Sequence, residues 1–296
     1  MRGLIQGARR SIAAPRRNLH PVLPMRALLA LAALALAPSL VSAQQRRSAQ
    51  DEGPLVSRGD AAVAAGFVVG SAALWPVDRY LAMRIQDSTV QAVEFARKAA
   101  TGFNTLARPG TLVISGALFA AGAATGNDGM RQVGRHGAEA VVLAEVLTRG
   151  VKAIAGRARP NVNPDDPHDF RLGRGWGDNR YQSFFSGHAS DAFAAATVFT
   201  AETARRNPGW EWPVGAVLYG SAALVGVSRM YDNKHWATDV LAGAALGTFL
   251  GLQVVRYHDK RDDGDVEPAP DGASPGTSVS LTLGGGGLSL GVGPGW

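Results

Sequence analysis

The sequence predicts an all-α protein, a compact bundle of about six core helices. Long apolar segments rich in alanine and leucine recur along the chain, at lengths typical of helices. These segments lack the alternation of β-branched and polar residues that strands show. With 296 residues, of which 46% are hydrophobic, the chain is long enough to bury one sizeable core.

The first 43 residues have the layout of a secretory signal peptide with an upstream extension. Met25 and Arg26 precede the apolar run ALLALAALALAPSL, and VSA follows it with small residues suited to cleavage before Gln44. An uncleaved membrane anchor is the alternative, which a proline and the shortness of the run disfavour. We therefore expect export to the periplasm or the cell-envelope membrane, with residues 44–58 as a polar linker.

The leader also carries the excess of positive charge. Residues 1–43 hold six arginines and no acid, which accounts for the whole formal charge of +6. Without the leader, the chain lacks the basic footprint of a nucleic-acid-binding protein, so we predict no nucleic-acid partner. The absence of cysteine excludes disulfides, thiolate metal sites and a cysteine nucleophile.

Seven apolar segments predict the helices of one domain over residues 59–256. They lie at about 61–76, 89–106, 109–126, 134–155, 189–205, 212–228 and 236–256. The uncharged stretches in four of them are 16 to 19 residues long, which is borderline against the roughly 20 residues of a spanning helix. Charges inside the segments at 134–155 and 189–205 slightly favour a soluble or peripheral bundle, and membrane association stays open.

Two regions lack the helical pattern. Residues 161–185 are rich in proline, glycine, aspartate and aromatics, and a loop this long is often functional, so we expect a lid or a substrate-lining loop. The tail at 257–296 is charged and then glycine-rich, with two short alternating runs around 284–287 that fit a hairpin. A tail without regular structure fits as well.

The first polar cluster is KAIAGRARP. Lys152 and Arg159 are seven residues apart, or two helical turns, so we expect them on one helix face with Pro160 ending the helix immediately afterwards. Two cations near a helix end can clamp an anion. Pairing with acids or snorkelling is the alternative.

The second polar cluster is SFFSGHAS. Ser186 can cap a helix that begins near His188, and Gly187 lets the backbone approach a ligand. Free N–H groups at a helix start bind phosphate, and His188 at the edge of that site could pass a proton to a leaving oxygen. An ordinary helix start explains the cluster equally well.

The third polar cluster is SRMYDNKHWATD. On a helix, His235 and Asp239 lie four residues apart on one face, where the carboxylate can accept the Nδ1 proton and leave Nε2 free as a nucleophile. Arg229, at the end of the preceding apolar segment, is expected to face the same pocket. A structural hydrogen bond is the alternative.

Taken together, these clusters resemble the superfamily of type-2 phosphatidic acid phosphatases, bacterial acid phosphatases and vanadium haloperoxidases. The motifs of that family are Lys, six residues, Arg-Pro; Pro-Ser-Gly-His; and Ser-Arg, five residues, His, three residues, Asp. The first and third match in full, and in the second Phe185 replaces the proline. The resemblance covers about residues 60–256 and implies an acid phosphatase/vanadium haloperoxidase-like helical fold.

By this resemblance, the chain would be a metal-independent phosphatase of phosphomonoesters or pyrophosphates, lipid phosphates among them. His235 would attack phosphorus to form a phosphohistidine, Asp239 would orient it, and His188 would protonate the leaving alkoxide and then activate water. The resemblance assigns the phosphoryl oxygens to Lys152, Arg159, Ser186, the Gly187 backbone and Arg229.

No metal and no cofactor are expected, since the cations replace magnesium. The loop aspartates at 165, 166, 169 and 178 could be read as a metal cluster, although a solvated loop is the simpler interpretation. His136, His168 and His258 lack partners at meaningful spacing, so surface or structural roles are expected for them.

Two other functions stay open. Vanadate bound to His235 would make a haloperoxidase, although family members of that kind tend to be longer. A non-catalytic envelope protein that binds phosphate or lipid headgroups is the second alternative, and the departure at Phe185 is its only support. The identity of the substrate, a phosphorylated small molecule or a lipid phosphate, does not follow from the sequence.

Overall fold

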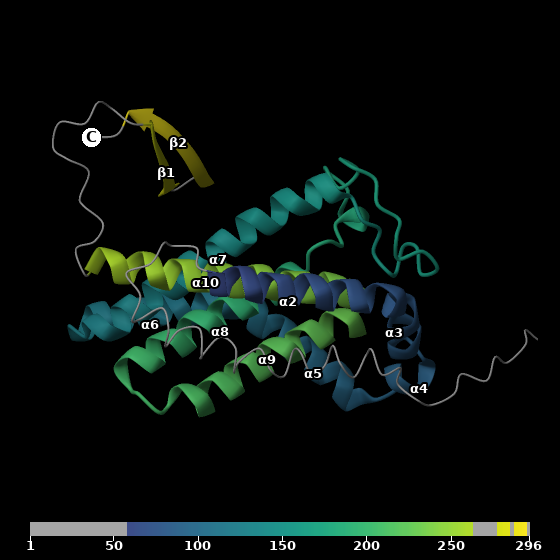
Figure 1. Cartoon of the computed structure of the whole chain (residues 1–296), viewed down its shortest axis with the longest axis horizontal. Coiled ribbons are helices and arrows are strands. Elements are labelled where there is room, and N and C mark those ends of the chain that lie inside the picture. Colours follow the sequence, from purple (N-terminus) through teal and green to yellow (C-terminus); the bar gives the residue numbers. More distant parts are fainter. Residues whose placement is uncertain (1–57, 263–276, 285–286, 295–296) are drawn as a thin grey trace, which may run out of the picture.

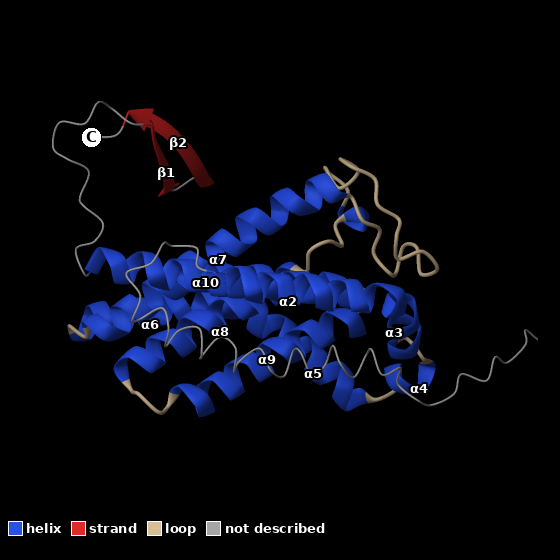
Figure 2. Ribbon diagram, in the orientation of Figure 1, coloured by secondary structure: helices blue, strands red, loops and turns tan. Residues whose placement is uncertain are grey.

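In the computed structural model, residues 58–262, 277–284 and 287–294 are described, and residues 58–262 form a bundle of helices (Figures 1 and 2). The helices are α2 (Arg58–Leu74), α3 (Asp78–Ile85), α4 (Ser88–Gln91), α5 (Glu94–Thr105), α6 (Thr111–Thr125), α7 (Asp128–Ala155), α8 (Gly187–Arg206), α9 (Glu211–Tyr231) and α10 (Ala237–Asp262). Short helical turns lie at η1 (Trp75–Val77), η2 (Leu106–Gly110) and η3 (Asn179–Tyr181). The all-α prediction is confirmed. The predicted signal peptide lies outside the described residues.

Most of the predicted segments coincide with observed helices. The segment at 89–106 is divided, because Asp87 caps the short α4 and α5 starts afresh at Glu94. The short and rather polar α3 was not predicted. α10 continues past residue 256, where the domain was expected to end, to Asp262.

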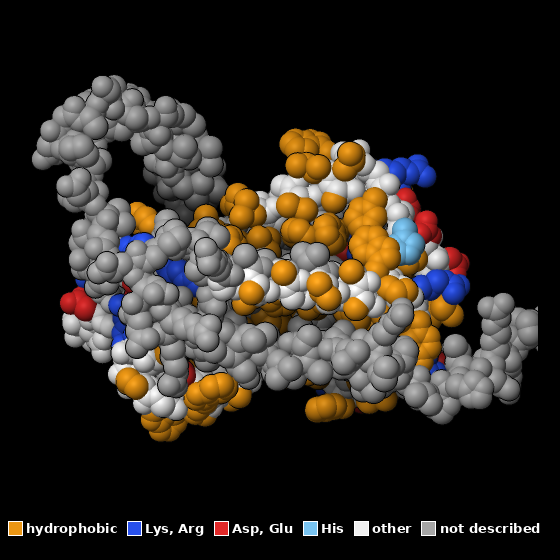
Figure 3. Space-filling model, viewed as in Figure 1, with side chains coloured by type: hydrophobic (Ala, Val, Ile, Leu, Met, Phe, Trp, Pro, Cys, Tyr) orange, Lys and Arg blue, Asp and Glu red, His pale blue; other side chains and the backbone are white. Residues whose placement is uncertain are grey.

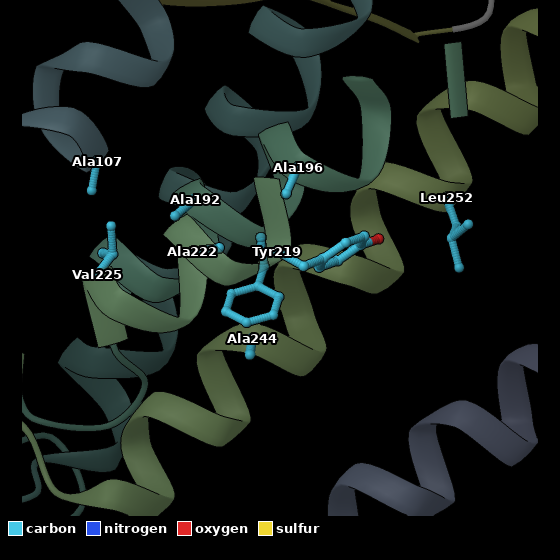
Figure 4. Close-up of a cluster of buried hydrophobic side chains, with 9 residues drawn as sticks. Ala107, Ala192, Ala196, Tyr219, Ala222, Val225, Ala244 and Leu252 are labelled. Atoms are coloured by element: carbon cyan, nitrogen blue, oxygen red, sulfur yellow. The ribbon is translucent and has the colours of Figure 1, made fainter. Parts of the chain in front are cut away.

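Helix α8 lies at the centre of the bundle, packed against α7, α9 and α10. One buried cluster joins α8, α9 and α10 to η2, and Figure 4 shows Ala107 of η2 and Val225 of α9 pointing towards each other. Small residues let the helix backbones approach closely. At Gly247 of α10, an added Cβ would lie 2.1 Å from the carbonyl oxygen of Ser190 in α8.

Large apolar side chains remain exposed around this core. Three helical stretches, 94–125, 211–231 and 237–261, are long and apolar enough to cross a membrane. Figure 3 shows hydrophobic side chains over much of the described surface on one face, with charged side chains towards the two ends. The exposed apolar residues of α6, α7 and α9 include Val113, Ile114, Phe119, Val146, Leu147, Ile154, Val217 and Leu224.

The tail contains the hairpin that the alternating runs suggested. β1 (Thr277–Gly284) pairs antiparallel with β2 (Gly287–Pro294), with Gly284 opposite Gly287.

Two of the remaining histidines have structural roles at the end of the bundle opposite the C-terminus of α7. His136 and His258 stack with ring centroids 4.0 Å apart. His136 Nδ1 lies 2.5 Å from Glu202 Oε1, and both side chains are inaccessible to solvent. His168 is exposed in the long loop and stacks on Trp75.

Candidate functional site

Three helix ends meet where the loop after α7 folds back over the bundle: α7 ends there, and α8 and α10 begin there. Ser186 N–H donates to the carbonyl oxygen of Asp239 at 2.9 Å. The indole N–H of Trp236 donates to the carbonyl oxygen of Ala158 at 2.9 Å. These bonds tie together the segments that carry the three predicted clusters.

Lys152 and Arg159 lie at the same site, although not in the predicted way. α7 ends at Ala155, because Gly156 adopts a left-handed conformation with φ of 59° and closes the helix. Arg159 therefore lies in the loop, and the prediction that Pro160 ends the helix is wrong. The loop still brings the two cations close enough for the charge of Arg159 to act on Lys152.

Lys152 is half-buried, and no acid is paired with its ammonium. Within residues 58–262 it forms no hydrogen bond or ion pair. Burial is the main reason that the pKa of Lys152 falls to about 7, and the charges of Arg159 and Arg108 lower it further. A partly buried cation without a partner is unfavourable, and an anionic ligand would lower that penalty.

Arg229 lies in the last turn of α9, as predicted. Its Nη1 donates to Asn104 Oδ1 at 2.8 Å and to Asp232 Oδ2 at 3.1 Å, which fixes the guanidinium. The Nε groups of Arg229 and Arg159 are buried and have no hydrogen-bond partner in the described part of the chain. Both therefore have a donor left for a ligand.

Ser186 and Gly187 form the start of α8. Ser186 is the N-cap, and its Oγ accepts a hydrogen bond from the N–H of Ala189 at 3.5 Å, which confirms the predicted helix start. An added Cβ at Gly187 would lie 2.5 Å from Nη2 of Arg108. Glycine thus leaves room for another cation at this helix N-terminus.

His188 lies in the first turn of α8. Burial, followed by the charges of Arg229 and Arg108, lowers the pKa of His188 to about 2. Its imidazole is therefore neutral when no anion is bound.

His235 and Asp239 meet, but His235 precedes α10 rather than lying on it. The prediction that both share one helix face is wrong, because Trp236 is the residue before the helix and its N–H donates to Asp239 Oδ2 at 2.8 Å. His235 Nδ1 lies 3.6 Å from the same oxygen. Burial lowers the pKa of His235 to about 3 although Asp239 opposes the shift, so this imidazole is also neutral.

A buried network that the sequence did not predict holds Asp239. Arg157 Nη1 donates to Asp239 Oδ1, and Ser183 Oγ donates to Asp239 Oδ2, each at 2.5 Å. Arg157 Nη2 donates to Asp78 Oδ2 at 2.8 Å, and Asp78 Oδ1 accepts the N–H of Thr238 at 3.0 Å. Arg157 lies inside the KAIAGRARP segment and so could have been suspected, whereas nothing in the sequence around Asp78 pointed to it.

The aspartates of the long loop mostly pair with arginines. The pairs are Asp165 with Arg79, Asp169 with Arg174, and Asp178 with Arg180. Among the described residues, no group of three or more His, Asp or Glu is arranged to hold a metal ion.

These features define a helical protein in which three half-buried cations and two neutral histidines gather near the start of α8. The profile of the PAP2 superfamily matches residues 137–263, which contain all three clusters. Residues 137–263 therefore match the PAP2 superfamily, and the recognition from the three clusters is confirmed.

Known proteins similar to this chain act on phosphorylated lipids. A lipid A 1-phosphatase of Porphyromonas gingivalis is 46% identical over 69 residues, 23% of this chain and 15% of that protein. A lipid A 4'-phosphatase of the same organism is 31% identical over 134 residues, 44% of this chain and 54% of that protein. This chain thus spans about half or less of these relatives. A PAP2-type phosphatidylglycerolphosphate phosphatase from Bacillus subtilis aligns over 68% of this chain and 96% of its own, with a TM-score of 0.48 and 22% identity.

Proposed function

We propose that this chain is a phosphatase that hydrolyses lipid phosphates or lipid pyrophosphates through a phosphohistidine intermediate. The observation that carries the proposal is the half-buried, unpaired ammonium of Lys152, grouped near the start of α8 with Arg159 and Arg229, whose buried Nε groups also lack partners among the described residues. A phosphoryl group suits this arrangement, because its oxygens accept hydrogen bonds from cations and from free backbone N–H groups.

The catalytic roles follow from the geometry around the two histidines. His235 is neutral, and its Nδ1 faces Asp239, so Nε2 is the nucleophile that attacks phosphorus. The negative charge of a bound phosphate favours the protonated form of His188, at the start of α8, so His188 takes up a proton as the substrate binds. It gives this proton to the leaving oxygen and then takes a proton from the water that hydrolyses the phosphohistidine. The cations stabilise the charge that the phosphoryl oxygens carry in the transition state.

We also propose that catalysis needs no metal. In other phosphoryl-transfer enzymes, metal ions bridge phosphate oxygens and neutralise their charge. Here Lys152, Arg159 and Arg229 supply fixed positive charge at the same site, so the chemistry has no step that requires a further cation.

An apolar cavity next to this site supports a lipid substrate. The cavity has a volume of about 500 Å³ and lies between α2, α10 and the residues just before α8. Phe185 and Thr238 line it, and they neighbour Ser186 and Asp239 in the sequence. A phosphate in the cation site would therefore have an apolar space beside it for a hydrocarbon chain. The names of the relatives point to the same substrate class.

The apolar helices support a membrane location for the protein. The three stretches long enough to span, together with the exposed apolar side chains of α6, α7 and α9, favour this placement over the soluble or peripheral alternative. We further propose export to the cell envelope, on the basis of the leader sequence.

The test is hydrolysis of a lipid phosphate in detergent and of a simple phosphomonoester, in EDTA, with and without vanadate. We expect turnover that vanadate inhibits and that His235→Ala and His188→Ala abolish. His168→Ala is the matched control, because this histidine lies in the exposed loop, and it should remain active. A radiolabelled, base-stable and acid-labile phosphoprotein in the wild type, absent from His235→Ala, would identify the intermediate.

Activity that persists in both site variants would contradict this mechanism. Oxidation of bromide by the vanadate-loaded protein would instead favour a haloperoxidase. Binding of phosphate analogues without turnover of either ester would favour the non-catalytic alternative.

A further inference from the structure

Arg108 lies in η2, between α5 and α6, within a stretch apolar enough to span a membrane. A cation in such a segment costs free energy, and it usually has a functional partner. Arg108 Nε contacts Asp191 of α8, and Nη2 contacts Glu145 of α7. The two carboxylates hold its guanidinium in one place between three helices.

The guanidinium of Arg108 lies against the N-terminus of α8. A Cβ at Gly187 would be 2.5 Å from its Nη2 and 3.4 Å from its Nη1. Arginine carries five N–H donors, and the two carboxylates use those of Nε and Nη2. Within the described residues, no hydrogen bond involves Nη1. Its two N–H donors are therefore available beside the phosphoryl site.

The electrostatics place Arg108 on the side of the site where His188 lies. After burial, the charges that lower the pKa of His188 are those of Arg229 and Arg108, ahead of those of His235 and Lys152. On His235 the charges that act are those of Asp239, Lys152 and Arg229. His235 is the nucleophile and His188 serves the leaving group, so the Arg108 side is the leaving-group side.

We propose that Arg108 is a substrate-binding residue that contacts the leaving group through Nη1 and favours substrates whose leaving group is itself a phosphate. This proposal rests on the function proposed above and adds to it a contact outside the three sequence clusters. It also gives a second reason for glycine at position 187, besides the approach of its backbone to a ligand, since any side chain there would displace the guanidinium.

The chemistry of a phosphoric anhydride suits this contact. His235 Nε2 bonds to the terminal phosphorus while the bond from that phosphorus to the bridging oxygen breaks. The electron pair stays on the bridging oxygen, and a lipid monophosphate departs. Water then attacks the phosphorus of the phosphohistidine and gives a proton to His188, while the bond from phosphorus to Nε2 breaks and its electron pair returns to His235, so that orthophosphate leaves.

The two kinds of leaving group make different demands. A phosphate monoester has a second pKa of about 6, so its bridging oxygen leaves with stabilisation of its charge and without a proton. An alkoxide is a far stronger base and needs a proton from His188. Arg108 supplies positive charge and no transferable proton, and so it helps the first kind of leaving group much more.

The experiment compares farnesyl diphosphate with farnesyl phosphate, which share one hydrocarbon chain. The full chain in detergent is assayed as wild type, Arg108→Gln and Arg149→Gln. Arg149 is the matched control, since it also pairs with Glu145 but its side chain is 77% exposed. We expect Arg108→Gln to lower kcat/KM for the diphosphate about 10- to 100-fold more than for the monophosphate, as the loss of a charged hydrogen bond implies. Arg149→Gln should lower neither.

A second variant separates binding from folding. Arg108→Lys keeps a positive charge for Asp191 and Glu145 but loses the forked donors of the guanidinium. It should fold, be inhibited by vanadate like the wild type, and still show selective loss of diphosphate hydrolysis.

Equal losses on the two substrates, or no loss on either, would overturn the assignment of Arg108 while leaving the proposed function intact. A wild-type protein that hydrolyses neither substrate nor the lipid phosphates would show that the proposed function is wrong, and the role of Arg108 would fall with it.

Discussion

Arg157 Nη1 lies 2.5 Å from Oδ1 of Asp239, and both side chains are inaccessible to solvent. The guanidinium also donates to Asp78 and to the carbonyl oxygen of Pro167, so Arg157 joins the loop after α7 to the starts of α3 and α10. Its planar fork matches several acceptors at once, which an ammonium cannot do. Arg157 thereby fixes the carboxylate that faces His235.

We predict that Arg157→Lys lowers kcat at least about tenfold with little effect on KM, because a small misplacement of a catalytic group is costly. If Arg157 positions His235 through Asp239, the substitution should also shift the pH at which kcat falls on the acidic side of its pH profile. A purely structural defect would not shift that pH. Arg157→Met should lower the free energy of unfolding by about 3–5 kcal/mol, since it leaves two buried carboxylates without their partner. Arg180→Lys, in an exposed pair with Asp178, is the control and should resemble the wild type in both assays.

Substitutions at three glycines should distinguish effects on activity from effects on stability. Gly187→Ala places a Cβ against the guanidinium of Arg108, which can shift only by disturbing its pairs with two carboxylates, so activity should be lost while Tm falls less than in Gly247→Ala. Gly247→Ala places a Cβ 2.1 Å from a backbone oxygen in α8 and should destabilise the protein by about 1–3 kcal/mol or more. Gly220→Ala has no atom within 4 Å of the new Cβ and should be neutral or stabilising. A Tm loss for Gly187→Ala as large as that for Gly247→Ala would contradict this separation.

The sequence predicted the helices because burial of alanine- and leucine-rich segments dominates this fold, and the observed α7, α8 and α9 lie close to the predicted ranges. It also identified the functional clusters, but not their local geometry. Gly156 ends α7 early through a backbone conformation that helical spacing does not reveal. His235 precedes α10 because Asp239 caps that helix.

The supporting residues could not be predicted in the same way. Asp78 acts through a contact with Thr238, 160 positions further along the chain, and such pairs depend on the tertiary fold. Arg108 had one local signal, since it is a lone charge directly before an apolar helix. Its proximity to Gly187 became evident only from the packing of η2 on α8.

Lys152 should give kcat/KM an alkaline limb. Burial lowers the pKa of Lys152 to about 7 in the free protein, so the ammonium loses its proton, and the site loses a positive charge, as the pH rises through that value. We expect kcat/KM to fall above about pH 7 in the wild type. Lys152→Arg should be less active near pH 6 but should keep its activity to higher pH, because arginine stays charged. The substrate's own ionisation is common to both proteins, so an alkaline limb at the same pH in both would exclude Lys152 as its source.

Glu202, at the end of the bundle opposite the candidate site, should make the stability of the protein depend on pH. Burial by itself raises the pKa of Glu202, but the hydrogen bonds from His136 and Arg206 outweigh it and bring the pKa to about 2, below the usual 4.5 of a glutamate. The resulting stabilisation is present above the unfolded value and is lost as the pH falls towards 2. We expect Glu202 to contribute on the order of 2 kcal/mol to the decline in stability between about pH 5 and 3, so that thermal unfolding in detergent shows a smaller decline for Glu202→Gln than for the wild type. Glu94→Gln, on exposed α5, should follow the wild type, and an undiminished decline in Glu202→Gln would contradict the assignment.

The cavity beside the site should control the use of long-chain substrates. Ala245 of α10 lines this cavity, and Ala245→Phe would fill part of its volume without touching the cations or histidines of the site. A hydrocarbon chain that occupies the cavity would then be displaced, and each buried methylene contributes about 0.8 kcal/mol to binding. We expect KM for a long-chain phosphatidic acid to rise at least about tenfold, while a water-soluble phosphomonoester is hydrolysed at the wild-type rate. Ala223→Phe, on α9 and outside the cavity lining, is the control for the added bulk. Equal KM values for the long-chain substrate in the wild type and Ala245→Phe would mean that the chain binds elsewhere, whereas a loss of activity on both substrates would show that the new ring disturbs the catalytic residues.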